Sequence, residues 1–438
     1  MKGRKVISGA ILVIVVIAIF SSYVIHANRE TQIVLDFGIF SGNLWDVPSV
    51  DSYKYIDEAI EKFERENPGV KVKYRPGTLK SDYSEWLSQK IIKGEEPDVF
   101  CVLPGDFNTL ASIGIMKNLD GLVEKDKNFD INKIYDNAVK LGQLKGIQYA
   151  MPKELNPMLM FVNKTLLDKE GIPVPDSDWD WNDFYNICMK VTKDLDGDRI
   201  LDQFGATGFT WQLAAYTNGQ QLFDTDGKNA LFDKPEVLDA VKFVQMLYKI
   251  NMNQNVSDAD FERGCVAFAP FRFSEYMRYK TYPYRVAKYN NYEWGCIKLP
   301  RGADGKNAAD LSSSLFCISS RTQHEKEAWN FLKFLIYDEE IQLKTIKYSH
   351  SIPVLKGVTE SDEAKIELNR DNPDKMISVN QKMLSEIIEQ SVVTPRFHKY
   401  EKAMDLADKE LFQIINGDYS PLTNLTKINR ELEYFLIN

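Results

Sequence analysis

Strand-like and helix-like runs alternate between residues 32 and 114, and this order restricts the fold more than any other feature of the sequence. Apolar residues that alternate with polar ones, or form a short run between prolines, predict strands at 32–40, 70–74 and 98–103. Helical spacing of apolar residues predicts helices from residue 52 to the stop signal Asn67-Pro68-Gly69, at 83–94 and at 106–114. This order predicts βαβ units, a parallel sheet, and ligand sites at the carboxyl ends of its strands.

The pattern changes after residue 146. Strand-like runs and then a helix are predicted within 147–167, a helix capped by Asp180 at 180–192, and a long helical tract at about 208–252. Strand patterns return at 265–271, 294–299 and 314–320, followed by a helix at 324–338 and a mostly helical C-terminal third. A two-lobed α/β protein, with strands near both ends and an inserted second lobe, accounts for this order.

The N-terminus is a separate segment. Lys2, Arg4 and Lys5 precede twenty residues without a charge, Val6 to Ile25, which is long enough to span a bilayer. The basic residues predict a cytoplasmic N-terminus and export of everything that follows. Ala27 suits position −1 of a signal cleavage site, but Ile25 is a poor residue at −3, so we favour a retained anchor over a cleaved signal. In either case the body is expected at the outer face of the cytoplasmic membrane.

Composition excludes several classes of protein. The 438 residues are 44% hydrophobic with a formal charge of −9, and the basic residues are scattered, so neither disorder nor nucleic-acid binding is expected. Five widely spaced cysteines predict mostly buried apolar side chains, with a bridge from 265 to 296 or from 296 to 317 left open.

An acidic loop, "DLDGDRILD" at 194–202, raises the question of calcium. Asp194, Asp196, Asp198 and Asp202 stand where a calcium loop places oxygen ligands, but position twelve is Gly205 instead of a bidentate glutamate. A polar turn-rich connection is the competing interpretation. No cofactor is required by the sequence, and calcium in this loop would be structural.

Several stretches together resemble one family. They are "FERENPGVKVKY" (63–74), "GEEPDVFCVLPGDFNTLASIGIMKNLD" (94–120), "GIQYAMPKELNPMLMFVNKTLLDKEGIPVPDSDWDWNDF" (146–184) and "AWNFLKFLIYDEEIQ" (328–342). In the same order along nearly the whole exported chain, they resemble the extracellular solute-binding proteins of carbohydrate ABC importers, which are similar to maltose-binding protein. The acidic loop before "DQFG" (202–205) also fits this family.

The resemblance implies a type II periplasmic-binding-protein (Venus-flytrap) fold, a monomer whose two α/β lobes close over a sugar and present it to membrane permease subunits. The expected divisions are a signal or anchor at 1–28, the first part of the N-lobe at 29–145, a mainly C-lobe part at 146–290, returning strands and a helix at 291–345, and a helical part at 346–438. Two departures stand out: no lipid-anchoring cysteine follows the apolar segment, and "DLSSSLF" (310–316) replaces a usual glycine-rich stretch.

Sugar sites combine aromatic faces with carboxylates, amides and arginine. Residues of these types at predicted strand ends and loops are the candidate ligand contacts: Asn43, Trp45, Asp106, Glu154, Asn156, Trp211, Gln212, Arg272, Trp294 and Ser313. Each has a structural alternative, since tryptophans also fill cores, Asp106 could cap a helix, and Arg272 could pair with Glu275. Arg396 is a weaker candidate.

Two other functions remain open at this point. A secreted glycosidase could use Asp106 and Glu154, but no catalytic motif organises them. A membrane-anchored sugar sensor would share the fold and pass its bound state to a signalling partner. A third version replaces the sugar by a peptide or a metal: the paired Tyr282 and Tyr284 would suit iron, but no histidine or carboxylate cluster accompanies them. Sugar import ranks ahead of sensing, and catalysis ranks last.

Overall fold

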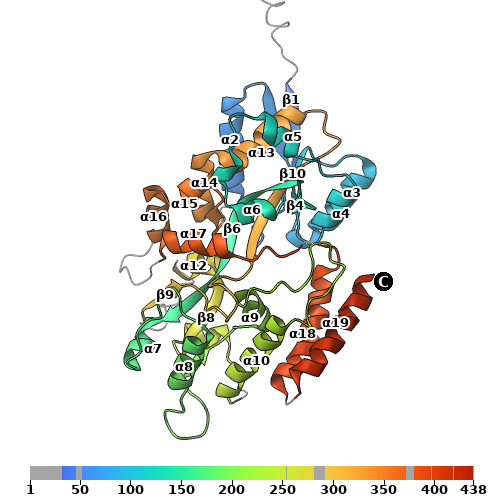
Figure 1. Ribbon diagram of the computed structural model, residues 1–438. Helices are drawn as coiled ribbons and strands as arrows, with labels where there is room; N and C mark the ends of the chain where they lie inside the picture. The colour runs from blue at the N-terminus through green and yellow to red at the C-terminus, as the bar shows by residue number, and fades with distance from the viewer. Residues whose placement is uncertain are drawn as a thin grey trace, which may run out of the picture.

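The computed structural model describes residues 32–45, 52–252, 254–280, 292–370, 379–395, 397–417 and 419–437. These residues form two α/β lobes joined through a shared sheet, with the upper lobe of Figure 1 built mainly from the N-terminal half of the chain. The N-terminal segment 1–28, Arg396, Tyr282 and Tyr284 lie outside the described residues. Among the helices that the structure describes, none is long and apolar enough to cross a membrane.

The upper lobe contains the parallel strands predicted from the N-terminal alternation. β1 (Ile33–Gly38) lies between β2 (Val70–Tyr74) and β3 (Val99–Val102) and pairs with both in parallel. Antiparallel β10 (Leu311–Ile318) continues the sheet beyond β3. Helices cover this sheet: α2 (Ser52–Glu66), α3 (Lys80–Lys93), α4 (Phe107–Ser112), α5 (Asp120–Lys125), η1 (Ile131–Lys133), α6 (Asp136–Lys140), α13 (Glu325–Tyr337), α14 (Glu339–Tyr348), α15 (Lys356–Thr359), α16 (Asp362–Asn369) and α17 (Gln381–Gln390).

One long strand passes from the upper lobe into the lower. β6 (Ala150–Asn163) pairs with β10 and with the short β11 (Ile352–Pro353) through its first half. Its second half pairs with β8 (Val266–Arg272) and β9 (Trp294–Ile297). The partner changes between Pro157 and Met158, so the chain crosses between lobes within a continuous strand. A separate two-stranded sheet joins β4 (Gln143–Leu144) to β5 (Ile147–Gln148).

The lower lobe is completed by β7 (Phe204–Ala206), which pairs in parallel with β8. Its helices begin and end as follows: α7 (Lys164–Lys169), α8 (Trp181–Val191), α9 (Trp211–Thr217), α10 (Pro235–Ile250), α11 (Asp258–Glu262), α12 (Phe273–Lys280), α18 (Tyr400–Asn416) and α19 (Pro421–Ile437). The last two form a hairpin against α10 (Figure 1).

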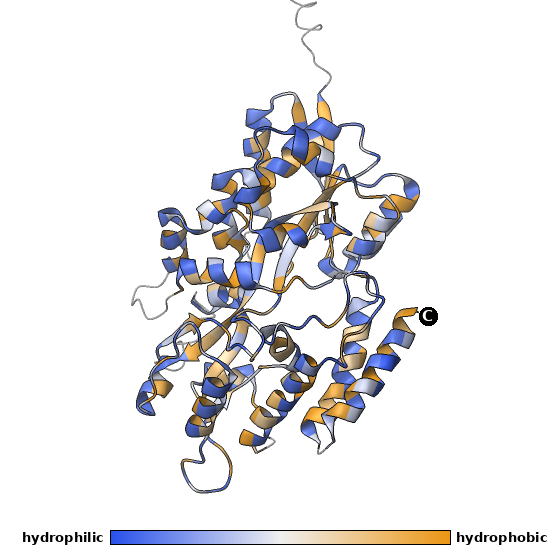
Figure 2. Cartoon of the chain, viewed as in Figure 1, coloured by the Kyte–Doolittle hydropathy of each residue, from blue (hydrophilic) through white to orange (hydrophobic). Residues whose placement is uncertain are grey.

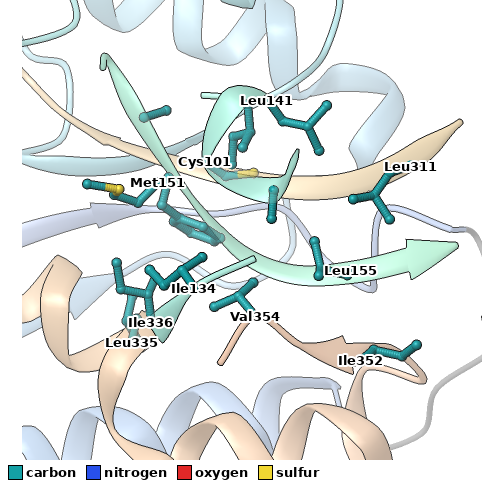
Figure 3. Close-up of a cluster of buried hydrophobic side chains, with 14 of the residues drawn as sticks. Cys101, Ile134, Leu141, Met151, Leu155, Leu311, Leu335, Ile336, Ile352 and Val354 are labelled. Atoms are coloured by element: carbon teal, nitrogen blue, oxygen red, sulfur yellow. The ribbon is translucent and has the colours of Figure 1, made fainter. Parts of the chain in front are cut away.

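A dense core surrounds the first half of β6. Met151 and Leu155 are fully buried there among side chains from β3, β10, α13 and the segment around Val354 (Figure 3). Apolar and polar residues are interspersed along the longer helices of both lobes (Figure 2), and the buried residues of α10 and α18 recur every three or four positions, as on one side of a helix. This core holds the crossing strand rigidly at its upper end.

Most predicted elements are confirmed. Gly94 ends α3 in the left-handed conformation with φ 69°, and Asp180 begins α8 with a capping box that includes Asp183. The continuous helical tract predicted at 208–252 is wrong, because residues 218–234 separate α9 from α10. All five cysteines are thiols outside any disulfide, and four of them are buried, as expected for small apolar side chains.

Candidate ligand-binding site

The strand registers bring the carboxyl ends of both lobes' parallel strands to the crossing point. In the upper lobe, Val102 at the end of β3 lies opposite Leu315 of β10. The first residue of β10, Leu311, lies opposite Pro157 of β6. In the lower lobe, Arg272 at the end of β8 lies opposite Met158. Both sets of strand ends therefore face the region where the lobes meet, which is where open α/β sheets bind ligands.

The upper lobe contributes the loop after β1 and the turn after β3. Asn43 is largely buried, and its Oδ1 accepts a hydrogen bond from the backbone N–H of Trp45 at 3.0 Å. Trp45 is half-buried. Asp106 precedes α4 without capping it and instead accepts a hydrogen bond from the Ser84 hydroxyl at 2.6 Å. Half-exposed aromatic and carboxylate groups of this kind suit a sugar's C–H face and hydroxyl rim.

Arg272 ties the crossing segments together. Its guanidinium donates hydrogen bonds to the backbone carbonyls of Asn156 and Asp310, both at 3.2 Å, and forms an ion pair with the Asp310 carboxylate. Asp310 also forms a β-bridge with Val392, which lies on the third segment that connects the lobes. The alternative pairing of Arg272 with Glu275 does not form, because Arg272 pairs with Asp310 and Glu275 pairs with Arg278. We call Arg272, Asp310 and Asn156 the hinge cluster.

Asn156 joins the hinge cluster to the start of α12. Its side chain is 1% exposed, accepts a hydrogen bond from the Ser274 N–H at 2.9 Å and donates one to the Ser274 hydroxyl at 3.1 Å. It therefore fixes the start of α12 to β6. A ligand could reach Asn156 only by displacing these bonds.

Two tyrosines extend the hinge cluster into the lower lobe. The hydroxyls of Tyr216 on α9 and Tyr400 on α18 lie 3.1 Å apart. Burial, with the charges of Tyr400 and Asp310, raises the pKa of Tyr216 well above its usual value, while Arg272 opposes the shift. The charges of Arg272 and Asp310 therefore contribute to the electrostatic environment of Tyr216.

Glu154 lies beneath the surface and is bonded within the protein. A β-bulge at Ser314/Leu315 leaves Lys153 as the extra residue of β6, and its ammonium lies 2.8 Å from Glu154, with both side chains about 5% exposed or less. Burial alone would raise the pKa of Glu154, but the charge of Lys153 and hydrogen bonds from Ser314 and Ser349 lower it. Glu154 is therefore corrected from a ligand contact to a structural anion.

Four further candidates also have structural roles. Trp211 and Gln212 both donate hydrogen bonds to Asp408, which joins α9 to α18. Trp294 is 1% exposed and stacks on Phe161 with ring centroids 5.1 Å apart, and Ser313 is 1% exposed within β10. Because these side chains are used in packing, we leave them out of the proposed site.

The acidic loop brings three of its four predicted ligands together. One oxygen each from Asp194, Asp196 and Asp202 lie within 4.8 Å of one another, while Asp198 is not in this group. The Asp194 carboxylate also has hydrogen-bond donors within the loop, because it accepts hydrogen bonds from the backbone N–H groups of Gly197 and Arg199. These bonds lower the pKa of Asp194. The hydrogen bonds account for the shape of the loop without a cation.

A second set of contacts joins the lobes beyond the hinge cluster. Tyr276 on α12 donates a hydrogen bond to the backbone carbonyl of Leu368 at 3.1 Å, and Lys280 donates to the same carbonyl at 2.8 Å. Lys298, after β9, forms an ion pair with Glu386 of α17 at 2.6 Å. These bonds connect lower-lobe elements to upper-lobe helices and would resist lobe motion on this side.

This contact region should respond to acid through His350. Burial and the charge of Lys280 lower the pKa of His350 to about 4, against 6.5 in an unfolded chain. Between those values the unfolded chain binds more protons, so stability should be fully present above pH 6.5 and fall by about 3 kcal/mol as pH drops toward 4. Urea unfolding across this range measures the slope. His350→Asn, which tolerates the local φ of 51°, should flatten it. Identical slopes in wild type and His350→Asn would contradict this assignment.

Sequence reasoning missed several residues of this region. Lys153 could not be predicted to pair with Glu154, because neighbouring side chains along a regular strand point to opposite faces of the sheet. The bulge at this point of the strand pair allows the two side chains to meet. Asp310, Tyr216 and Tyr400 are distant in sequence from Arg272, and pairing between them depends on the crossings. The sequence contains one indication of Asp310: this residue begins the stretch "DLSSSLF" (310–316), which stands where related proteins usually have a glycine-rich stretch.

Two lobes joined by crossing segments, with strand ends facing the junction, define a ligand-binding protein of the two-lobed α/β class. Residues 48–341 match the bacterial extracellular solute-binding protein family, and the chain belongs to that family. Family membership identifies a binding protein and not an enzyme, and places it outside the cytoplasm.

Relatives and solved structures agree with this assignment. The chain is 21% identical over 390 residues to the galactooligosaccharide-binding protein of Bacillus subtilis (strain 168), covering 84% of this chain and 83% of that protein. Its fold is similar to the ABC substrate-binding protein of Listeria monocytogenes in complex with cycloalternan, with a TM-score of 0.67, 21% identity, and coverage of 92% and 99% of the two chains. The sugar-binding protein MalE of Xanthomonas citri gives a TM-score of 0.76 at 15% identity, covering 92% and 97%.

Proposed function

We propose that this protein is the extracytoplasmic substrate-binding component of an ABC importer, and that it binds a sugar or oligosaccharide between its lobes. The observation that supports this most strongly is the hinge cluster, which places an arginine and a carboxylate where the strand ends of both lobes converge. Trp45 and Asp106 would contact the ligand from the upper lobe, and Arg272 and Tyr400 from the hinge and the lower lobe.

Binding at such a junction explains how the bound state would be reported. A sugar that contacts both lobes does so fully only when they approach, so it stabilises the closed shape. Membrane permease subunits would recognise that shape, and the apolar segment 6–25 would keep the protein near them. A monomer is sufficient for this task.

A thermal-shift screen of residues 29–438 against mono- and oligosaccharides tests the proposal. A sugar at about one hundred times its dissociation constant should stabilise the folded protein by about 2.7 kcal/mol and raise Tm. The sugar should be recovered intact, which separates binding from hydrolysis. If no saccharide raises Tm, the sugar-binding proposal fails, and a sensor of another ligand becomes the better explanation.

Calcium in the loop 194–202 is a separate proposal. Three carboxylates within 4.8 Å suit a hard cation, but without a bidentate glutamate we expect weak, millimolar binding. Adding about 10 mM calcium should then raise Tm slightly in the wild type and not in Asp194→Asn. An equal Tm in calcium and in EDTA would mean that the loop is only a turn.

A further inference from the structure

A small polar cavity lies beneath the loop that follows β1. Its volume is about 30 Å³, and its lining comes from the loop after β1, α2, β3, β6, β10 and the end of α14. The polar side chains in this lining are Asn43, Tyr55, Lys153, Glu154, Ser314, Tyr348 and Ser349. The cavity is separate from the hinge cluster, none of whose residues lines it.

At this cavity one hydroxyl has no hydrogen-bond partner among the described residues, and one ammonium has a single hydrogen bond. Tyr55 is 1% exposed, and its hydroxyl has no hydrogen-bond partner. The Lys153 ammonium lies 4.5 Å from the centroid of the Tyr55 ring and makes one hydrogen bond, to Glu154 at 2.8 Å. An ammonium has three N–H donors, so Lys153 retains unused capacity.

Glu154 does not supply the missing acceptor, because the Tyr55 hydroxyl has no hydrogen-bond partner and the carboxylate bonds to other groups. Its Oε1 accepts a hydrogen bond from the Ser314 hydroxyl at 2.8 Å, and its Oε2 accepts from Lys153 at 2.8 Å and from the Ser351 hydroxyl at 3.2 Å. A buried hydroxyl without a partner destabilises the folded state, because it has lost its bonds to water and gained none in return. Native proteins remove such costs with ordered water where the site is polar and large enough.

We propose that this cavity is a binding site for one ordered water molecule, held by the Tyr55 hydroxyl and the Lys153 ammonium. A cavity needs roughly 10–15 Å³ to hold a water, and this one exceeds that size. The adjacent ammonium disfavours a sodium ion in the same place, because two like charges would be buried together. The water lies under Gly42, Asn43 and Leu44, so it also supports the loop that carries Trp45.

The direction in which Tyr55→Phe changes Tm tests the proposal. If Tyr55 binds water, Tyr55→Phe removes a satisfied hydroxyl and lowers Tm by about 1–3 °C. If the cavity is dry, the same change removes an unsatisfied hydroxyl, and Tm stays equal or rises. Tyr83→Phe calibrates the scale, because Tyr83 is also fully buried and its hydroxyl donates directly to the Cys101 carbonyl at 2.9 Å. A Tyr55→Phe variant at or above the wild-type Tm overturns the proposal.

A crystal structure of the exported chain gives the direct observation. We expect density for a water within hydrogen-bonding distance of Tyr55 Oη and Lys153 Nζ in the wild type, and its loss or displacement in Tyr55→Phe. Tm should be the same in sodium chloride and in choline chloride at equal ionic strength. An empty cavity in well-resolved density, or stabilisation that requires sodium, would overturn the assignment of water.

Discussion

Replacing Lys153 by methionine is expected to lower the free energy of unfolding by about 3–5 kcal/mol. The substitution leaves the Glu154 carboxylate buried at 3% exposure without its counter-ion, and removal of one partner of a buried pair costs far more than the pair itself contributes. Lys153 also packs on Tyr55, and methionine keeps most of that apolar contact. Urea denaturation of the wild type and the variant measures the difference.

The double variant Lys153→Met with Glu154→Gln provides the control. Because it removes both charges, it should recover a large part of the lost stability. Lys71→Met is the matched surface change, since Lys71 pairs with Glu64 but is about half exposed, and it should cost about 1 kcal/mol or less. If Lys153→Met were as mild as Lys71→Met, the buried pair would have no structural role.

Arg272→Met is expected to weaken sugar binding by about tenfold or more, which corresponds to about 1.4 kcal/mol of binding free energy. The change removes three hydrogen bonds that join β6, β8 and the start of β10, and leaves Asp310 without its cation. The two lobes would then sample more relative orientations, and the ligand would have to order them. Titration calorimetry with the sugar found by thermal shift measures the loss.

Two further variants sharpen this test. Arg272→Lys keeps the charge, but a single ammonium cannot reproduce the forked contacts, so affinity should be intermediate. Arg263→Met removes an exposed arginine that pairs with Asp260 and should bind sugar as the wild type does. Wild-type affinity in Arg272→Met would show that the hinge cluster does not contribute to ligand binding.

The order of helices and strands could be predicted because each element depends on the pattern of residues within its own segment. β1 to α4 follow periodicity and stop signals that act within a few residues, and Gly94 ends α3 for a conformational reason visible in the sequence. The prediction of one continuous helix at 208–252 is wrong because it follows the apolar content of the stretch and neglects the turn-forming pair Asn218–Gly219. In the structure Gly219 has φ 81°, and Asn218 holds the turn through the N–H of Asp304 and the carbonyl of Glu236.

The candidate site could be predicted only in part, since its geometry is non-local. Residue type and strand-end position were enough to select Arg272 and Asn156, which the fold does bring together. The same criteria also selected Trp294, because an indole suits a core as well as a sugar, and only stacking on Phe161 decides between them. The burial of Glu154 depends on a bulge, which alternation along a strand does not reveal.

The shared strand β6 has a consequence for how the protein denatures. Fourteen residues contribute hydrogen-bonded neighbours to both lobes, and one apolar cluster extends from Leu35 in β1 to Trp294 in β9. The lower lobe also has a core of its own, built from α8, α9, α10, α18 and α19, but unfolding either lobe alone would expose part of the shared cluster and remove half of the strand partners of β6. We therefore expect the two lobes to unfold together. Scanning calorimetry of the exported chain should therefore show one endotherm, with equal calorimetric and van't Hoff enthalpies, despite its two-lobed shape.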